Sequence, residues 1–499
     1  ISPRYGLGWA LLAMAGTLLA GAWAFAEEPP APPNLVIILA DDLGYGDLHC
    51  YDEASKIPTP HLDELASQGM RFLDAHAPSA VCTPTRYALL TGRYAWRTRM
   101  KSGVLWTNDR LLIEPGRDTI ASLLGRHGYE TACIGKWHLG LGAYDPNAPA
   151  GKSDHCQAVD AGPHTVGFAY SLILPASLDI PPYLYLENGR PTQPVTRRAQ
   201  ASSRRWSGGG GFWREGRMAE GFDHEQVLPT ITARSVRWIR ERAASGSGRP
   251  LFLYVPLTAP HTPWMPTAPF RGRSEAGWYG DFVAQVDGAV GQIMKALGEA
   301  GLAENTLLLV TSDNGSHWRP ADIREHGHRA NGKWRGQKAD IHEGGHRVPF
   351  LVRWPAVVAP RSTSATLVGL NDVYATLAAI VGEEVRPNAA EDSVSFLPAL
   401  RGQRDVGRHA LVLHAIDGMF AIRRGAWKLV AGLGSGGFTK PRRREPGADG
   451  VPGQLYDLDA DPREERNLYG ERPDLVADLA RLLALERAPL PAHEAEGEE

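Results

Sequence analysis

Several strongly apolar segments of this 499-residue chain end on polar side chains, and this pattern restricts its fold more than any other feature. The segments lack the alternation of polar and apolar residues that marks a half-exposed strand. Strands covered on both faces belong to parallel sheets flanked by helices, and ligands of such sheets bind beyond the carboxyl ends of the strands. The pattern predicts an α/β fold with a large, mainly parallel central sheet, in which these segments are strands: 35–39, 129–134, 251–255 and 307–310.

Composition and charge narrow the class of protein. Lys and Arg number 53 against 56 Asp and Glu, a net charge of −3, so there is no basic field and we expect no nucleic-acid partner. Hydrophobic residues at 43% and charged residues at 22% are ordinary for a globular chain and argue against disorder and against a multi-span membrane protein. Four cysteines exclude a disulfide scaffold, which leaves a large enzyme-like chain.

The chain divides into three expected parts. Residues 1–26 carry an apolar stretch that closes on Ala24-Phe25-Ala26, which predicts a signal peptide and a periplasmic or secreted protein; an uncleaved N-terminal anchor is the alternative. Residues 33–405 form the expected catalytic domain, with helices from His61 onward and over 286–297. For residues 406–490 we predict a smaller α+β subdomain with an antiparallel sheet, built from strands at 411–414, 419–423, 427–430 and 454–458 and a helix at 474–485.

An arginine-rich segment, residues 197–217, interrupts the expected catalytic domain. It contains six arginines, two tryptophans and a run of four glycines, and we interpret it as an insertion loop. The loop is either a solvated mobile segment or a basic, aromatic rim for a polyanionic or sugar substrate.

Two polar pairs follow strands of the predicted sheet. Asp41-Asp42 comes after the first strand and Asp313-Asn314 after the last. Oxygen ligands of this kind suit Ca²⁺ or Mg²⁺ better than zinc. The alternative is that both pairs only form turns, but their position at corresponding strand ends favours a metal site.

The segment Cys82-Thr83-Pro84-Thr85-Arg86 is the sharpest local motif. Pro84 suits the first position of a helix, which places Cys82 at the helix N-terminus with Arg86 one turn further on. This arrangement indicates an anion site that contains a nucleophile, with a buried structural thiol as the alternative.

The Cys82-x-Pro84-x-Arg86 core and its Leu-Thr-Gly-Arg continuation resemble the maturation signature of the type I, formylglycine-dependent sulfatases, arylsulfatase-like members of the alkaline phosphatase superfamily. Residues 128–138 resemble the second signature of that family, and the similarity extends from about Asn34 to Leu468. The resemblance implies an alkaline phosphatase-like fold and hydrolysis of a sulfate ester, of a sulfated carbohydrate or small molecule, to an alcohol and inorganic sulfate.

The resemblance also implies roles for individual residues. One calcium ion would be held by Asp41, Asp42, Asp313, Asn314 and the modified Cys82. A formylglycine-generating enzyme would oxidise Cys82 to formylglycine (3-oxoalanine), whose hydrate attacks sulfur and expels the alcohol. By the same resemblance, His138 would act as a base, and His261 and Lys338 would contact the ester and its leaving oxygen. Arg86 and Lys136 would support the hydrate, and Ser177 would contact the sulfate.

Other residues and functions stay open at this point. His326, His328 and Asn331 are expected to form substrate subsites or to belong to a plain loop, and His346 has no assigned role. Cys50, Cys133 and Cys156 cannot all pair within the chain. Two alternatives to a sulfatase remain: a phosphodiesterase or phosphonate monoester hydrolase of the same superfamily, and a non-catalytic polyanion-binding protein on the same fold.

Overall fold

A computed structural model of the chain describes residue 1 and residues 32–145, 152–203, 205, 212–386, 388–404, 406–448 and 450–489. The predicted signal peptide lies, apart from residue 1, outside the described residues. The chain from Pro32 onward forms one compact unit. Within the described ranges, no helix combines the length and the apolar character needed to cross a membrane.

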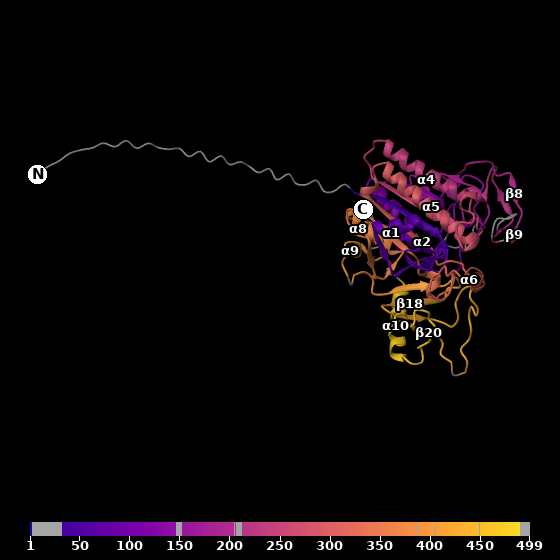
Figure 1. Cartoon of the computed structure of the whole chain (residues 1–499), viewed down its shortest axis with the longest axis vertical. Coiled ribbons are helices and arrows are strands. Elements are labelled where there is room, and N and C mark those ends of the chain that lie inside the picture. The colour runs from indigo at the N-terminus through magenta and orange to yellow at the C-terminus, as the bar shows by residue number, and fades with distance from the viewer. Residues whose placement is uncertain are drawn as a thin grey trace, which may run out of the picture. The chain divides into compact units, whose positions relative to one another are not determined.

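A ten-stranded sheet lies at the centre of this unit (Figure 1). Its five middle strands are parallel, in the spatial order β13 (Thr306–Ser312), β1 (Asn34–Asp41), β12 (Leu251–Pro260), β4 (Glu130–Lys136) and β5 (Tyr170–Leu174). Every residue of β1, β12 and β13 is buried, as expected for strands covered on both faces. The prediction of an α/β fold with a parallel centre is therefore confirmed.

The edges of the sheet are mixed, which the sequence pattern did not predict. β14 (Phe350–Arg353) lies antiparallel to both β13 and β2 (Met70–Phe72), and β15 (Ser362–Ser364) pairs with β2. At the other edge, β6 (Leu186–Glu187) and β7 (Arg190–Pro191) form a short antiparallel continuation of β5. These strands are too short to carry a hydrophobic period that could be distinguished from a loop.

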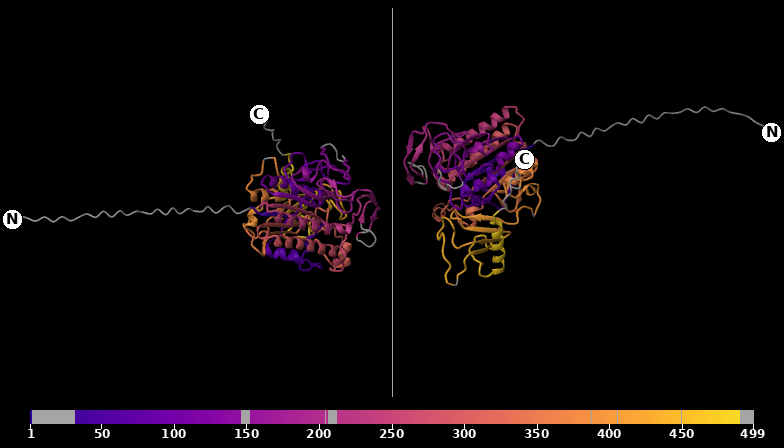
Figure 2. Two further views of the ribbon diagram at one scale, coloured as in Figure 1. Left: turned by 90° about the horizontal axis from the view of Figure 1, so that it is seen from above. Right: turned by 180° about the vertical axis from the view of Figure 1, so that it is seen from behind.

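Helices cover both faces of the sheet (Figure 2). On one face lie α1 (Pro60–Gln68), α4 (Val227–Ala244) and α5 (Gly277–Glu299), which contact one another and the strands. On the other face α2 (Cys82–Thr91), α3 (Ile120–Arg126) and α8 (Asp372–Val381) pack together. The smaller elements are α6 (Pro320–His326), α7 (Glu343–His346), α9 (Leu397–Leu400), β3 (Ala75–His76) and β16 (Val368–Gly369).

The C-terminal part carries its own antiparallel sheet (yellow end of Figure 1). Its strands are consecutive and each pairs with the next: β17 (Leu411–His414), β18 (Phe420–Arg424), β19 (Trp427–Val430) and β20 (Gln454–Asp457). Helix α10 (Pro473–Glu486) packs on β18 and β19 through the apolar side chains of Val476, Leu479 and Leu483. The sequence prediction for these elements agrees to within one residue at each end.

The arginine-rich segment is more ordered than the predicted loop. β8 (Arg197–Ala199) pairs with β11 (Gly216–Met218), and β9 (Ser202–Ser203) pairs with β10 (Phe212–Trp213). These strands are only two or three residues long, which is too short to show the apolar pattern by which a strand is predicted. Residues 204 and 206–211 lie outside the described part of the segment.

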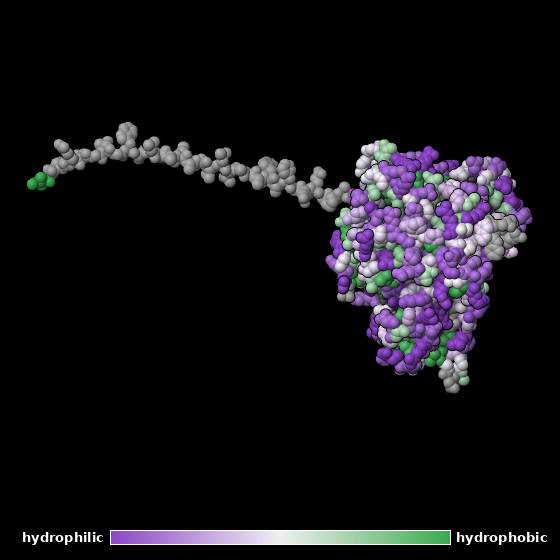
Figure 3. Space-filling view, viewed as in Figure 1, coloured by the Kyte–Doolittle hydropathy of each residue, from purple (hydrophilic) through white to green (hydrophobic). Residues whose placement is uncertain are grey.

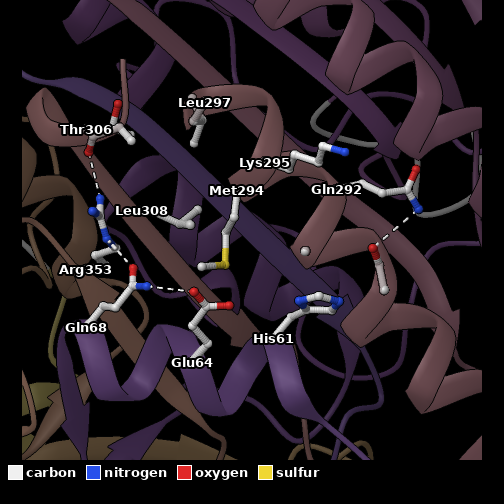
Figure 4. A pocket seen from close by; sticks show the side chains of 13 residues that line it. His61, Glu64, Gln68, Gln292, Met294, Lys295, Leu297, Thr306, Leu308 and Arg353 are labelled. Atoms are coloured by element: carbon white, nitrogen blue, oxygen red, sulfur yellow. Dashed lines mark hydrogen bonds between the residues drawn. The ribbon is translucent and has the colours of Figure 1, made fainter. Parts of the chain in front are cut away.

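A pocket of about 450 Å³ lies between α1 and α5 (Figure 4). His61, Glu64 and Lys295 are among its lining side chains, and Thr306 and Leu308 line it from the amino-terminal half of β13. The polar residues that we expect to form the site follow Ser312, at the opposite end of this strand. This pocket is therefore separate from the site described below.

Buried histidines should make the fold sensitive to acid. Burial lowers the pKa of His155, His224 and His414 to about 4, from an ordinary value of 6.5. The folded protein keeps these rings neutral, whereas the unfolded chain binds protons below about pH 6.5. We therefore expect the free energy of unfolding to decrease as the pH falls from about 6.5 towards 4, measured by urea denaturation at several pH values.

A His224→Phe variant isolates one of these contributions. The His224 ring stacks on Trp213 at 4.2 Å between centroids, and phenylalanine can keep this contact without a titrating nitrogen. The difference in the free energy of unfolding between the variant and the wild type should shift by about 2 kcal/mol in favour of the variant when the pH is lowered from 7.5 to 5. Exposed His49 provides the matched control, because His49→Phe should leave the pH dependence unchanged. Parallel pH profiles for wild type and His224→Phe would contradict the assignment.

Candidate active site

The predicted site residues converge at the carboxyl ends of four adjacent parallel strands. Asp41 ends β1, Lys136 ends β4, His261 follows β12 and Asp313 follows β13. Gly135 allows β4 to approach β12 here, because a Cβ atom at this position would lie 1.9 Å from the carbonyl oxygen of Pro256. The convergence is the one expected for a parallel sheet.

Cys82 is the first residue of α2, two positions earlier than the start predicted from Pro84. Its side chain is buried, and its Sγ lies 3.3 Å from Nδ1 of His138. The other ring nitrogen of His138, Nε2, lies 2.9 Å from the carbonyl oxygen of Leu105. A carbonyl only accepts, so Nε2 carries the proton and the lone pair of Nδ1 faces residue 82.

His138 has both an unusual backbone conformation and a shifted side-chain pKa. Its backbone has φ of 55°, in the left-handed region that residues with a Cβ atom rarely adopt. Burial, assisted by the positive charge of Lys136, lowers the pKa of His138 well below its ordinary value. The ring is therefore neutral at physiological pH and can accept a proton on the side of Cys82.

Three buried cations surround the nucleophile position. Arg86 lies one turn after Cys82 on the same face of α2 and donates from Nε and Nη2 to Oδ2 of Asp313, at 3.0 and 2.6 Å. Lys136 donates to both carboxylate oxygens of Asp41, at 2.9 and 2.7 Å. Lys338 lies 2.7 Å from Oδ1 of Asp42. The site therefore offers fixed positive charge in a region that water barely reaches.

Three carboxylates and one amide face these cations. Asp42 has φ of 68°, and its backbone N–H donates to Oδ1 of Asp313, which ties the two strand ends together. Burial alone would raise the pKa of Asp41, but Lys136, His261 and Arg86 hold it well below its usual range. Burial instead raises the pKa of Asp313 to about 6, although Arg86 acts against this shift.

These oxygen atoms fit a divalent cation. Asn314 donates from Nδ2 to Oδ1 of Asp42 at 2.7 Å, while its own Oδ1 is buried and has no hydrogen-bond partner. A buried acceptor without a donor is costly, and a cation can satisfy it. Three carboxylates and this amide oxygen form a donor set for a hard cation such as Ca²⁺.

The sequence and the fold both match one family along most of the chain. The family model described as "Sulfatase" matches residues 33–383. An N-acetylgalactosamine-6-O-sulfatase of Bacteroides thetaiotaomicron is 36% identical over 90% of this chain and 92% of its own length, and human arylsulfatase A is 34% identical over 91% and 87%. The chain is a member of the sulfatase family. Its activity is accordingly that of a sulfuric ester hydrolase.

A solved structure supports the same assignment. A Bacteroides thetaiotaomicron protein described in connection with the metabolism of multiple glycosaminoglycans superimposes with a TM-score of 0.79 at 32% identity. The match covers 92% of this sulfatase and 100% of the other chain. The predicted family resemblance is therefore confirmed, together with its large sheet and its separate C-terminal sheet.

The four residues that were predicted to bind the substrate have different environments from one another. The side chain of Ser177 is buried in the loop that follows β5. His328 is buried and its Nε2 lies 2.8 Å from Oδ1 of Asp47, while Asn331 accepts from the backbone N–H of Ser316 and donates to its carbonyl. The His326 ring packs against Trp318 in a tilted arrangement, with 5.5 Å between the ring centroids. Through these contacts His326, His328 and Asn331 pack against the loop at Ser316 and Trp318.

His317, three residues after Asn314, lies close to the sulfatase site and was not predicted from the sequence. Burial, with the positive charge of Arg205, lowers its pKa to about 3, and Asp42, Lys338 and His261 are near enough to affect it. Arg205 of the arginine-rich segment donates to the carbonyl oxygen of His317 at 3.1 Å and pairs with Asp322. The position of His317 three residues after Asn314 could have indicated that it lies near the site. The neighbouring sequence, however, did not distinguish it from an ordinary loop residue.

Two further observations complete the account of the predicted residues. His261 donates from Nδ1 to the carbonyl oxygen of Thr262, so that Nε2 faces Asp42 at 3.9 Å. Each of the four cysteines, all of which lie in the described ranges, is free of any disulfide.

Proposed function

We propose that this sulfatase is an exported, calcium-dependent enzyme that removes sulfate from a sulfated carbohydrate through a formylglycine made from Cys82. The first substrate to test is the 6-O-sulfate ester of N-acetylgalactosamine, because the B. thetaiotaomicron relative named for that activity is 36% identical over 90% of this chain. The observation that carries the proposal is the contact between Sγ of Cys82 and the proton-free Nδ1 of His138, at 3.3 Å. Predicted export rests on residues 1–26 alone.

The family implies two groups, a calcium ion and a formylglycine, and the residues of this chain suit both. Calcium would be held by Asp41, Asp42, Asp313 and Asn314, where it would supply positive charge to a sulfate oxygen. Formylglycine at position 82 would supply a hydroxyl nucleophile that an unmodified thiol lacks. The helix N-terminus at residue 82 favours a neighbouring anion, since its first backbone N–H groups have no partner inside the helix.

The side chains around position 82 transfer protons and neutralise charge. His138 accepts a proton at Nδ1 from the group at position 82 and keeps its tautomer through the Leu105 carbonyl. Lys136 and Arg86 neutralise negative charge beside the nucleophile. Lys338 carries ammonium protons next to Asp42 and can donate one to the leaving oxygen, with His261 alongside. Transfer of a sulfuryl group gains most from such clustered positive charge.

Sulfate release tests the proposal directly. The protein would be produced with a formylglycine-generating enzyme and assayed by ion chromatography on N-acetylgalactosamine 6-sulfate, on 4-nitrophenyl sulfate and on bis(4-nitrophenyl) phosphate. We expect sulfate release from the first two and slow turnover of the phosphodiester. Faster turnover of the phosphodiester would favour the phosphodiesterase alternative. Binding without turnover by fully matured protein would favour a polyanion-binding protein.

Removal of the metal should abolish most of the activity. We expect a chelator to lower kcat by about 100-fold or more, since a metal that stabilises the transition-state charge contributes several kcal/mol. Added Ca²⁺ should restore turnover and also raise the melting temperature, because three buried carboxylates then share a cation. Asn314→Ala should need more Ca²⁺ for both effects, whereas Asn388→Ala, a change at an exposed site, should not. Full activity in verified metal-free protein would contradict the assignment.

A further inference from the structure

A second pocket lies beside the active site and has no part in the chemistry described above. Its volume is about 590 Å³, and it lies where α6, the loop after it and the C-terminal subdomain meet. On the viewed face of the molecule, which carries α6, the surface is mostly hydrophilic (Figure 3). We call it the basic pocket, after its four cationic lining residues, Arg329, Lys333, Arg335 and Arg463.

The positive charge of the basic pocket is uncompensated. All four cations are exposed, and within the described ranges none of them has a carboxylate at ion-pair distance. Among the residues that line the pocket, Glu465 is the one acid. Elsewhere on this chain exposed arginines commonly pair, as Arg198 does with Glu215 and Arg466 with Glu471. A cluster of unpaired cations attracts anionic ligands and raises their local concentration.

A buried acceptor inside the basic pocket also lacks a partner. Gln337 is 6% exposed; its Nε2 donates to the hydroxyl of Thr439 at 3.3 Å, but its Oε1 has no hydrogen-bond partner. An acceptor left unsatisfied in this way calls for a donor such as a sugar hydroxyl. The pocket thus combines cations for an acid group with an acceptor for a hydroxyl, which together describe an acidic sugar.

The basic pocket is joined to the surroundings of the reaction centre through three lining residues. Gln337 immediately precedes Lys338, whose ammonium group lies beside Asp42. Trp318 immediately follows His317, which lies near Asp42 and Lys338. A third link is the loop of Phe438 and Thr439, since Phe438 contacts the His317 ring and Thr439 lines the pocket. The lining of the basic pocket is therefore continuous along the chain with the residues next to the reaction centre, at 317–318 and at 337–338.

We propose that the basic pocket is a subsite for an acidic sugar next to the sulfated one, so that the enzyme prefers oligosaccharides of an anionic glycan to sulfated monosaccharides. The carboxylate or sulfate of that sugar pairs with Lys333 and Arg463, and one of its hydroxyls donates to Oε1 of Gln337. This inference rests on the proposed function and deepens it, because it names the substrate as a polyanionic chain.

A chain-length comparison tests the subsite. The probes are N-acetylgalactosamine 6-sulfate and a 6-sulfated chondroitin hexasaccharide, compared for wild type, Lys333→Gln/Arg463→Gln and the control Arg401→Gln/Arg404→Gln. The control removes the same charge from exposed residues that follow α9. We expect the ratio of kcat/KM for the hexasaccharide to that for the monosaccharide to fall about tenfold in the first variant, through KM, and to be unchanged in the control. An equal ratio in all three proteins would overturn the subsite.

Binding measurements separate this inference from the proposed function. Binding of the hexasaccharide to each protein in the Cys82→Ala background should weaken in Lys333→Gln/Arg463→Gln only, and should weaken with added salt. This result supports the pocket even if the mature enzyme releases no sulfate. Desulfated chondroitin as a competitor identifies the anion: competition assigns a carboxylate, and competition by the sulfated chain alone assigns a sulfate. Binding that is equal in all variants, or absent from wild type, would reject the pocket.

Discussion

Replacing Cys82 by alanine should leave a folded protein that releases no measurable sulfate. Cys82 is 2% exposed and contacts His138, and it lies at the start of α2, outside the apolar clusters that form the core. The loss in kcat should be at least about 10⁴-fold, the scale seen when a covalent nucleophile is removed. Sulfate release and circular dichroism would be measured on the same preparation, so that a loss of activity is not confused with a loss of fold.

Mass spectrometry of the tryptic peptide Phe72–Arg86 accompanies this experiment. Wild-type peptide should show the mass change expected when the Cys82 thiol is replaced by an aldehyde. Cys133→Ala is the matched control, because Cys133 is equally buried but lies on β4, within the apolar core. It should lose some stability and keep its turnover. Wild-type rates in Cys82→Ala would remove residue 82 from the mechanism.

The central fold was accessible from sequence because its strands are long, apolar and completely buried. β1, β12 and β13 have no exposed residue, so a continuous hydrophobic run identifies each of them. The C-terminal strands were found because each is a short apolar run that is bounded by a turn containing glycine. β8 to β11 were missed, because strands of two or three residues are too short to show a hydrophobic period.

The candidate site was predictable where its residues follow strands or belong to a motif. The residues at strand ends are Asp41, Lys136 and Asp313. The residues that belong to a motif are Cys82 and Arg86. His317 and the basic pocket belong to neither group, since they arise from loops that only the folded chain brings together. Likewise, the burial of His328 and Asn331 depends on partners, Asp47 and Ser316, that no spacing rule connects to them.

A buried network of charges fastens the C-terminal sheet to the catalytic part. Lys428 of β19 lies 3.1 Å from Oε1 of Glu343 in α7 and 2.9 Å from Oε1 of Glu464, and all three side chains are inaccessible. Burial alone would raise the pKa of Glu343, but Lys428 and two arginines hold it well below its usual range. His346, which had no role in the sequence, has its Nε2 3.1 Å from Nζ of Lys428 and 3.0 Å from the carbonyl oxygen of Ile341. Arg347 and Arg423 pair with both Glu343 and Asp74, so the network holds three cations and three carboxylates and is stable only when it is complete.

Lys428→Met should therefore destabilise the protein strongly. The change leaves Glu343 and Glu464 buried with too few cations, and breaking a buried ion pair in this way costs about 3–5 kcal/mol. Urea denaturation at pH 7.5 would measure the loss. Arg466→Met, which removes the exposed partner of Glu471, should cost less than about 1 kcal/mol.

A second substitution separates lost charge balance from lost packing. In Lys428→Met/Glu464→Gln the surplus carboxylate is gone, so the double variant should be less destabilised than the sum of the two single variants. Strict additivity would mean that Lys428 contributes through its alkyl chain instead of its charge. A loss below about 1 kcal/mol in Lys428→Met itself would place the network among surface-like ion pairs, against its complete burial.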